Sequence, residues 1–280
     1  MSKKNYYKFF LLIILMFPMG CFVAPAAVET YQTYSLGKGG KAAVLSLKPI
    51  GEEEEKAIGG SLAIQVFNRF GGLYDNPELQ RYITLVGQSL ADVSDRPDLD
   101  YHFAVVNSEH PNAFATPGGY VFVSVGLLRV LENEAQLAGV LGHEIAHITH
   151  KHALKTLERN QKIAGFGALT VSMLGQSPDV FDKVIEQAGE IIFTYGLDKN
   201  LEYEADKMGV EYTGRLGYDS RGLKSFLNIL DKLQPGKGSV FLSTHPSPQD
   251  RLAHLSAGDS SGSSKPVFAA EFKQATQGKI

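Results

Sequence analysis

Apolar residues along most of the chain recur at the three- and four-residue spacing of amphipathic helices. From Glu52 onward, Ile58, Leu62 and Val66 follow this spacing, which predicts a first helix. The same pattern predicts further helices over residues 77–94, 133–160, 180–194, 199–216 and 221–233. Residues 163–175 are small and apolar, which favours a packed core helix, with a membrane-surface or lid segment as the alternative.

A short region between the second and third of these helices has the pattern of strands instead. Residues 101–106 largely alternate between the two faces of a strand. Residues 114–115 and 120–125 flank Thr116-Pro117-Gly118-Gly119, whose composition is typical of a turn. These residues are therefore predicted to form a β-hairpin.

The N-terminal residues have the composition of a secretory signal peptide. Three lysines precede or adjoin an apolar run over residues 9–16, and Ala24-Pro25-Ala26 follows as a small-residue cleavage site. The apolar run is much shorter than the roughly 20 residues needed to span a bilayer. Residues 1–26 are therefore expected to be a cleaved signal peptide rather than a permanent anchor, so the mature protein is expected to be exported.

Cys21, the single cysteine of the chain, allows a second interpretation of this segment. In a lipoprotein signal the cysteine becomes the acylated first residue, and its lipid would attach the protein to a membrane. Pro18 argues against this interpretation, because such signals usually carry leucine there. A peripheral or lipid-anchored membrane contact thus stays open. In both cases the mature protein has no cysteine pair, and no disulfide is expected.

Composition and charge limit the classes of function. Of the 280 residues, 44% are hydrophobic and 20% are charged, as in ordinary globular proteins. The net charge of -3 and the lack of a basic stripe exclude nucleic acid as the partner. We expect residues 27–50 to be an extended lead-in and residues 51–256 to be the folded domain. Residues 257–280 contain GDSSGSSK and are expected to form a flexible linker and C-terminal tail.

The clearest chemical signal is His143-Glu144-Ile145-Ala146-His147, inside the predicted helix over residues 133–160. Two histidines four residues apart share a helix face, with their Cβ atoms about 5–6 Å apart, so both rings can reach one ion. Neutral imidazoles suit zinc. Glu144, next to the first histidine, is placed to take a proton from the attacking water. The motif predicts a metallopeptidase with one Zn²⁺ per chain.

A catalytic zinc also needs a third protein ligand. Glu202 and Asp206 lie one turn apart on the predicted helix over residues 199–216 and share a face. Glu202 is predicted to be the third ligand, and Asp206 to accept the other ring N–H of a ligand histidine. Glu204 points elsewhere on this helix and is predicted to be an exposed charge.

Three other histidines have weaker signals. His150 and His152 follow the motif closely and are predicted to be packing or surface residues rather than ligands. His245 lies in the loop Thr244-His245-Pro246-Ser247-Pro248. It is predicted either to donate a hydrogen bond to the oxyanion that develops during hydrolysis or simply to cap the loop.

Several of these motifs together resemble the zinc metallopeptidase family of HtpX and the CAAX prenyl endopeptidases. The resemblance covers residues 50–255 and is closest to the soluble exported branch, which is linked to assembly of β-barrel outer-membrane proteins. It rests on residues 112–119, 126–128, 137–142 running into the zinc motif, 202–206 and 244–246.

The resemblance implies an α+β fold, mostly helical and of the zincin type, with a small β-sheet or hairpin edging the active site. It implies that His143, His147 and Glu202 bind zinc and that Glu144 is the catalytic base. It also implies a periplasmic location and the outer-membrane assembly machinery as a candidate partner.

Two functions stay open at this point. The first is an endopeptidase that hydrolyses unfolded or misassembled exported proteins, with the substrate backbone paired along Ala113, Phe114 and Ala115. The second is an assembly factor or chaperone whose peptidase site is latent, because family members can hold a loop histidine, here His245, against the zinc. A purely structural zinc is disfavoured, since two histidines and a carboxylate suit an open site better than a closed thiolate one.

Overall fold

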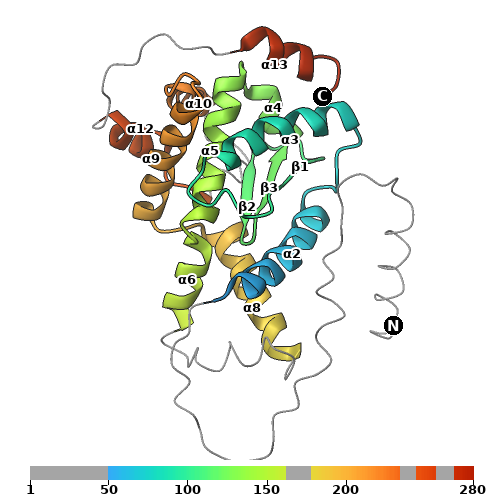
Figure 1. Ribbon diagram of the computed structural model, residues 1–280, viewed down its shortest axis with the longest axis vertical. Coiled ribbons are helices and arrows are strands. Elements are labelled where there is room, and N and C mark those ends of the chain that lie inside the picture. The colour runs from blue at the N-terminus through green and yellow to red at the C-terminus, as the bar shows by residue number, and fades with distance from the viewer. Residues whose placement is uncertain (1–49, 162–177, 234–243, 257–267) are drawn as a thin grey trace, which may run out of the picture. The chain divides into compact units, whose positions relative to one another are not determined.

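The computed structural model describes residues 50–161, 178–233, 244–256 and 268–280 (Figure 1). Several predictions concern residues outside these ranges. They are the signal peptide at 1–26 with its alternative at Cys21, the lead-in up to residue 49, the core helix at 163–175 and the linker at 257–267.

Most of the predicted helices are confirmed. They are α2 (Glu52–Arg69), α3 (Pro77–Asp92), α8 (Pro178–Glu190), α9 (Lys199–Arg215) and α10 (Gly222–Lys232). A π-helical turn, η5 (Ile191–Tyr195), continues α8, and α12 (Pro248–Ser256) follows the His245 loop. None of the described helices is long and apolar enough to cross a membrane.

The predicted strands and hairpin form one three-stranded sheet. Its strands are β1 (His102–Val106), β2 (Ala113–Thr116) and β3 (Tyr120–Ser124), in the order β1-β3-β2. β2 pairs antiparallel with β3, as the hairpin prediction requires, while β1 pairs parallel with β3. This small sheet among helices confirms the α+β fold (Figure 1). Within the described part of the chain, one edge of β2 pairs with no other strand, and β2 packs against α5 (Glu134–Thr149).

The helix predicted over residues 133–160 is wrong as a single element. α5 ends at Thr149, and a separate helix, α6 (His152–Gln161), begins three residues later. The break lies at Lys151, whose φ of 55° is left-handed and therefore incompatible with a continuous helix. The residues on either side of this break, His150 and His152, consequently do not follow the face of α5.

The strand predicted to extend to Val125 also ends one residue early. Ser124 instead caps a short helix, α4 (Val125–Val130), because its hydroxyl accepts the N–H of Leu127 at 3.0 Å. The same hydroxyl donates to the carbonyl of His110. One side chain thus ends β3, begins α4 and fixes the segment before β2.

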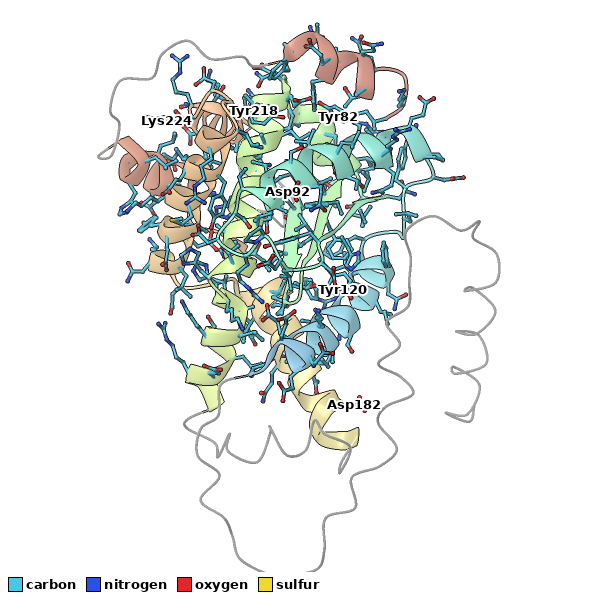
Figure 2. All side chains as sticks on the ribbon, viewed as in Figure 1. Tyr82, Asp92, Tyr120, Asp182, Tyr218 and Lys224 are labelled. Carbon is cyan, nitrogen blue, oxygen red and sulfur yellow. The ribbon has the colours of Figure 1, made fainter. Side chains whose placement is uncertain are left out.

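α5 is the central element of the core, and residues 135–148 are all buried. Its first turn is held by Glu134, which accepts hydrogen bonds from the hydroxyls of Tyr82 in α3 and Tyr218 after α9, both labelled in Figure 2. Farther along, Gly142 packs against Gly209 of α9, where a Cβ atom on Gly142 would lie 2.9 Å from the carbonyl oxygen of Gly209. The two helices therefore approach each other at backbone contact.

The C-terminal tail contains a helix that the sequence did not predict, α13 (Ala269–Thr276). Phe272 is 2% exposed and belongs to the same apolar cluster as α3 and α5. The hydroxyl of Tyr74 donates to the carbonyl of Lys279 at 2.7 Å. The last residues of the chain thus pack onto this body next to α3 (Figure 1).

Candidate metal centre

His143 and His147 project from one face of α5, as their spacing predicted. Their Nε2 atoms lie 3.0 Å apart, and the rings cross at 87°. Both side chains are buried. Two unprotonated ring nitrogens would repel each other at this distance unless a cation lay between them. This arrangement therefore suits two ligands of one metal ion.

Glu202 of α9 reaches the same point from the opposite helix. Its Oε2 lies 3.6 Å from Nε2 of His143, and its Oε1 lies 3.5 Å from Nε2 of His147. Two ligands that are each ~2.0–2.1 Å from a tetrahedral zinc lie about 3.3 Å apart, close to these distances. Oε1 is buried and accepts no hydrogen bond from the residues that the structure describes. The three side chains therefore fit a metal ion.

Asp206 lies one turn beyond Glu202, and its Oδ1 is 2.9 Å from Nδ1 of His143. A carboxylate can only accept here, so Nδ1 of His143 carries the proton and Nε2 is free to bind metal. Burial alone would raise the pKa of the Asp206 carboxyl, but Arg251 and His143 outweigh it and hold that pKa well below its usual range. Asp206 thus stays ionised and fixes the ring.

Arg251 is a site residue for which the sequence analysis assigned no role. It is 1% exposed, its Nε donates to Oδ2 of Asp206 at 3.0 Å, and its Nη2 donates to Oδ1. Nη2 also lies 3.2 Å from Nδ1 of His143. Since that nitrogen already donates to Asp206, the close approach is not a hydrogen bond. The only signal available in the sequence was the position of Arg251 shortly after the His245 loop.

Glu144 faces a cavity beside these ligands. The cavity is lined by residues of β2, α5, α9 and the His245 loop, among them Ala113–Pro117, Glu144, His147, Glu202 and His245. Glu144 is 2% exposed, and its Oε1 has no hydrogen-bond partner within the described part of the chain. Burial raises the pKa of its carboxyl above the usual value, against the opposing effect of His143 and His245. A raised pKa brings a carboxylate closer to the range useful for a general base.

His245 joins the metal cluster directly. Its Nδ1 lies 2.7 Å from Oε2 of Glu202, and its ring centre is 5.5 Å from that of His143. The loop that carries it passes close to Gly196, where a Cβ atom would lie 2.0 Å from the carbonyl oxygen of Thr244 and where φ is 73°. Desolvation would lower the pKa of His245, but the Glu202 carboxylate raises it overall.

The edge strand β2 lies along the cavity. The N–H of Ser124 donates to the carbonyl of Asn112, so these two residues form a hydrogen-bonded pair. Along two antiparallel strands, hydrogen-bonded and non-hydrogen-bonded residue pairs alternate. The backbone N–H and carbonyl of Phe114 therefore form hydrogen bonds with β3, while those of Ala113 and Ala115 point to the free edge of β2. The N–H of Ala113 is already bound to the side-chain oxygen of Asn112 at 2.9 Å. Among the residues that the structure describes, nothing pairs with the two backbone groups of Ala115 or with the carbonyl of Ala113.

The remaining predicted residues lie on the far side of His147. Glu204 is 43% exposed, as predicted, and approaches both His150 and His152. His152 is fully buried, and its Nδ1 lies 2.9 Å from Nδ1 of His147. It is a packing residue, as expected, but one in contact with a metal-site histidine.

The profile of peptidase family M48 matches residues 77–258, a stretch that contains every residue of this centre. The beta-barrel assembly-enhancing protease of Escherichia coli (strain K12) is 29% identical over 239 residues, covering 82% of this chain and 48% of that protein. The protein of the same name from Yersinia pestis is 32% identical over 215 residues, covering 72% and 43%.

A mitochondrial relative is also similar. The mitochondrial metalloendopeptidase OMA1 of Schizosaccharomyces pombe is 30% identical over 180 residues, covering 62% of this chain and 51% of that protein. The chain thus spans about half the length of these relatives.

Proposed function

The chain belongs to peptidase family M48, as its motifs predicted, and from this premise we propose that it is a zinc-dependent endopeptidase. The observation that carries the proposal is the convergence of His143, His147 and Glu202 at ligand spacing. Glu144 lies beside them on the wall of the same cavity. One zinc ion per chain is proposed, because imidazole and carboxylate ligands with an open position suit catalytic zinc.

The chemistry is hydrolysis of a peptide bond by water. A bound zinc ion would polarise the carbonyl and lower the pKa of water to about 7. Glu144 takes the proton of the attacking water and later passes it to the leaving amine. Asp206, itself held by Arg251, keeps the ring of His143 in place throughout. His245, in its assisting role, donates to the developing oxyanion.

The substrate is proposed to lie along β2 as an added strand. Ala115 offers an N–H and a carbonyl, and Ala113 offers a carbonyl, for pairing with an extended peptide. Phe114 bonds to β3 and supports this edge. Recognition through the main chain tolerates many sequences, which suits hydrolysis of unfolded or misassembled exported proteins.

This proposal includes a periplasmic location. Attachment to the membrane through a lipidated Cys21 is the alternative to a free, cleaved form. The location is supported by the signal-peptide composition of residues 1–26. Contact with outer-membrane assembly machinery is proposed by analogy, because two similar proteins are named beta-barrel assembly-enhancing proteases.

Metal removal tests the proposal. We expect the purified protein to contain zinc, to cleave casein or a quenched fluorescent peptide, and to lose this activity in a chelator. Zinc added back should restore it. Cleavage that continues after the metal content has fallen to zero would refute the proposed function.

A second candidate, an assembly factor with a latent peptidase site, is favoured by the contact of His245 with Glu202 at 2.7 Å. In this case His245 occupies the position that water or substrate needs. His245→Ala should then raise peptide cleavage several-fold at equal zinc content. A fall in cleavage in a folded, zinc-loaded variant would instead assign His245 to the assisting role.

A further inference from the structure

A second group of metal-ligating side chains lies next to the first. His150 follows the last residue of α5, His152 begins α6, and Glu204 projects from α9. Nδ1 of His150 is 3.1 Å from Oε1 of Glu204, and Nε2 of His152 is 3.3 Å from Oε2. The three ligand atoms lie within 4.8 Å of one another. The left-handed turn at Lys151 brings the two histidines to this point.

Each histidine of this group lies at zinc-ligand spacing from one oxygen of Glu204, His150 from Oε1 and His152 from Oε2. Neighbouring ligands of a tetrahedral zinc lie about 3.3 Å apart, close to both measured distances. Two imidazoles and one carboxylate are also ligands that zinc and related divalent ions accept. Two members of this group are in contact with solvent, because Glu204 is 43% and His150 is 22% exposed, while His152 is buried. Zinc from solution can therefore reach it, and water can complete its coordination.

The two groups are connected through His152. Its Nδ1 lies 2.9 Å from Nδ1 of His147, while its Nε2 faces Glu204. When His147 binds metal through Nε2, its Nδ1 carries the proton and must donate to an acceptor. His152 can accept at Nδ1 only if its own proton lies on Nε2, where it donates to Glu204.

A metal ion on Nε2 of His152 would remove that proton site. The neutral ring would then carry its proton on Nδ1, directly facing the proton on Nδ1 of His147. Two N–H groups at this distance repel each other, so metal at one group disfavours metal at the other. We propose that His150, His152 and Glu204 form a second zinc site, of lower affinity, whose occupancy opposes zinc binding at His143, His147 and Glu202.

This inference rests on the proposed function only in taking zinc as the ion of the first site. Free zinc then has a regulatory effect. Excess zinc inhibits the protein, because an ion at the second site lowers the affinity of the first site for the catalytic ion. The competing interpretation is that Glu204 only bridges two ring N–H groups and binds no metal.

Zinc titration against a chromophoric chelator tests the site without any activity measurement. Wild-type protein should bind two zinc ions, and His150→Gln should bind only the tighter one. Glu202→Ala should lose the first site. Because coupling between sites is reciprocal and is typically 5–150-fold, this variant should hold the second ion at least about fivefold tighter than wild type does. His254→Gln, which alters an exposed histidine stacked on Tyr203, should behave as wild type.

An inhibition curve provides the second readout. Excess zinc should inhibit peptide cleavage by wild type and by His254→Gln at the same concentration. For His150→Gln, the zinc concentration that gives the same inhibition should be at least about tenfold higher. The proposal is overturned if wild type binds one zinc ion only, if His150→Gln still binds two, or if Glu202→Ala gains no affinity for the remaining ion. A wild-type protein that cleaves no peptide would refute the proposed function, yet the binding curves would still decide the second site.

Discussion

Glu144→Gln should lower the rate of peptide hydrolysis by about 10²–10⁴-fold, which is the usual contribution of a general base. The amide has nearly the same shape as the carboxyl but cannot take a proton from water. Glu144 is not one of the three residues that converge on the metal position, so zinc content should stay at the wild-type level. Stopped assays of peptide cleavage, with zinc measured on the same samples, provide the test.

The variant should also fold normally. Burial raises the pKa of Glu144, so the site disfavours the charged form and should accept a neutral side chain. Glu53→Gln, which changes an exposed residue at the start of α2, serves as the control and should keep full activity. Retention of wild-type cleavage by Glu144→Gln would remove Glu144 from the role of base.

Arg251→Met should lower the free energy of unfolding by about 3–5 kcal/mol, since it leaves the charge of Asp206 buried without its partner. Both side chains of this pair are nearly inaccessible, at 1% and 0% exposure. Denaturant unfolding followed by circular dichroism measures the change. Zinc affinity should fall as well, by about 10–100-fold, because Asp206 would no longer hold the ring of His143 in place.

An exposed ion pair provides the matched control. Arg159 and Asp198 are 59% and 66% exposed, so Arg159→Met should cost at most about 1 kcal/mol. The double variant Arg251→Met/Asp206→Asn removes the uncompensated charge and should recover part of the lost stability. Equal unfolding curves for Arg251→Met and Arg159→Met would contradict the importance assigned to the buried pair.

Sequence patterns predicted the parts of the centre that depend on one helix at a time. The four-residue spacing of His143 and His147 sets a shared face of α5, and that of Glu202 and Asp206 sets a shared face of α9. The hairpin was predictable because its turn contains Gly118 and Gly119, both at positive φ. In each case, the signal lies within a few residues of the chain.

Several features that depend on contacts between distant segments were not predicted. Lys151 has no intrinsic preference for a left-handed conformation, and helical spacing continues across it, so the break between α5 and α6 left no local signal. Arg251 looks like any charged residue on a short helix until α12 packs against α9 and buries it with Asp206. The tail helix likewise depends on α3, which covers Phe272.

The backbone contact between Gly142 and Gly209 limits which substitutions this protein can accept during evolution. A Cβ atom on Gly209 would lie 2.7 Å from the backbone nitrogen of His143, so the separation of the helices is set at the very residue that binds metal. No side-chain packing lies between them at this point. Substitutions elsewhere in the interior can therefore accumulate and repack while the coordination distances persist, whereas these two positions tolerate no larger residue.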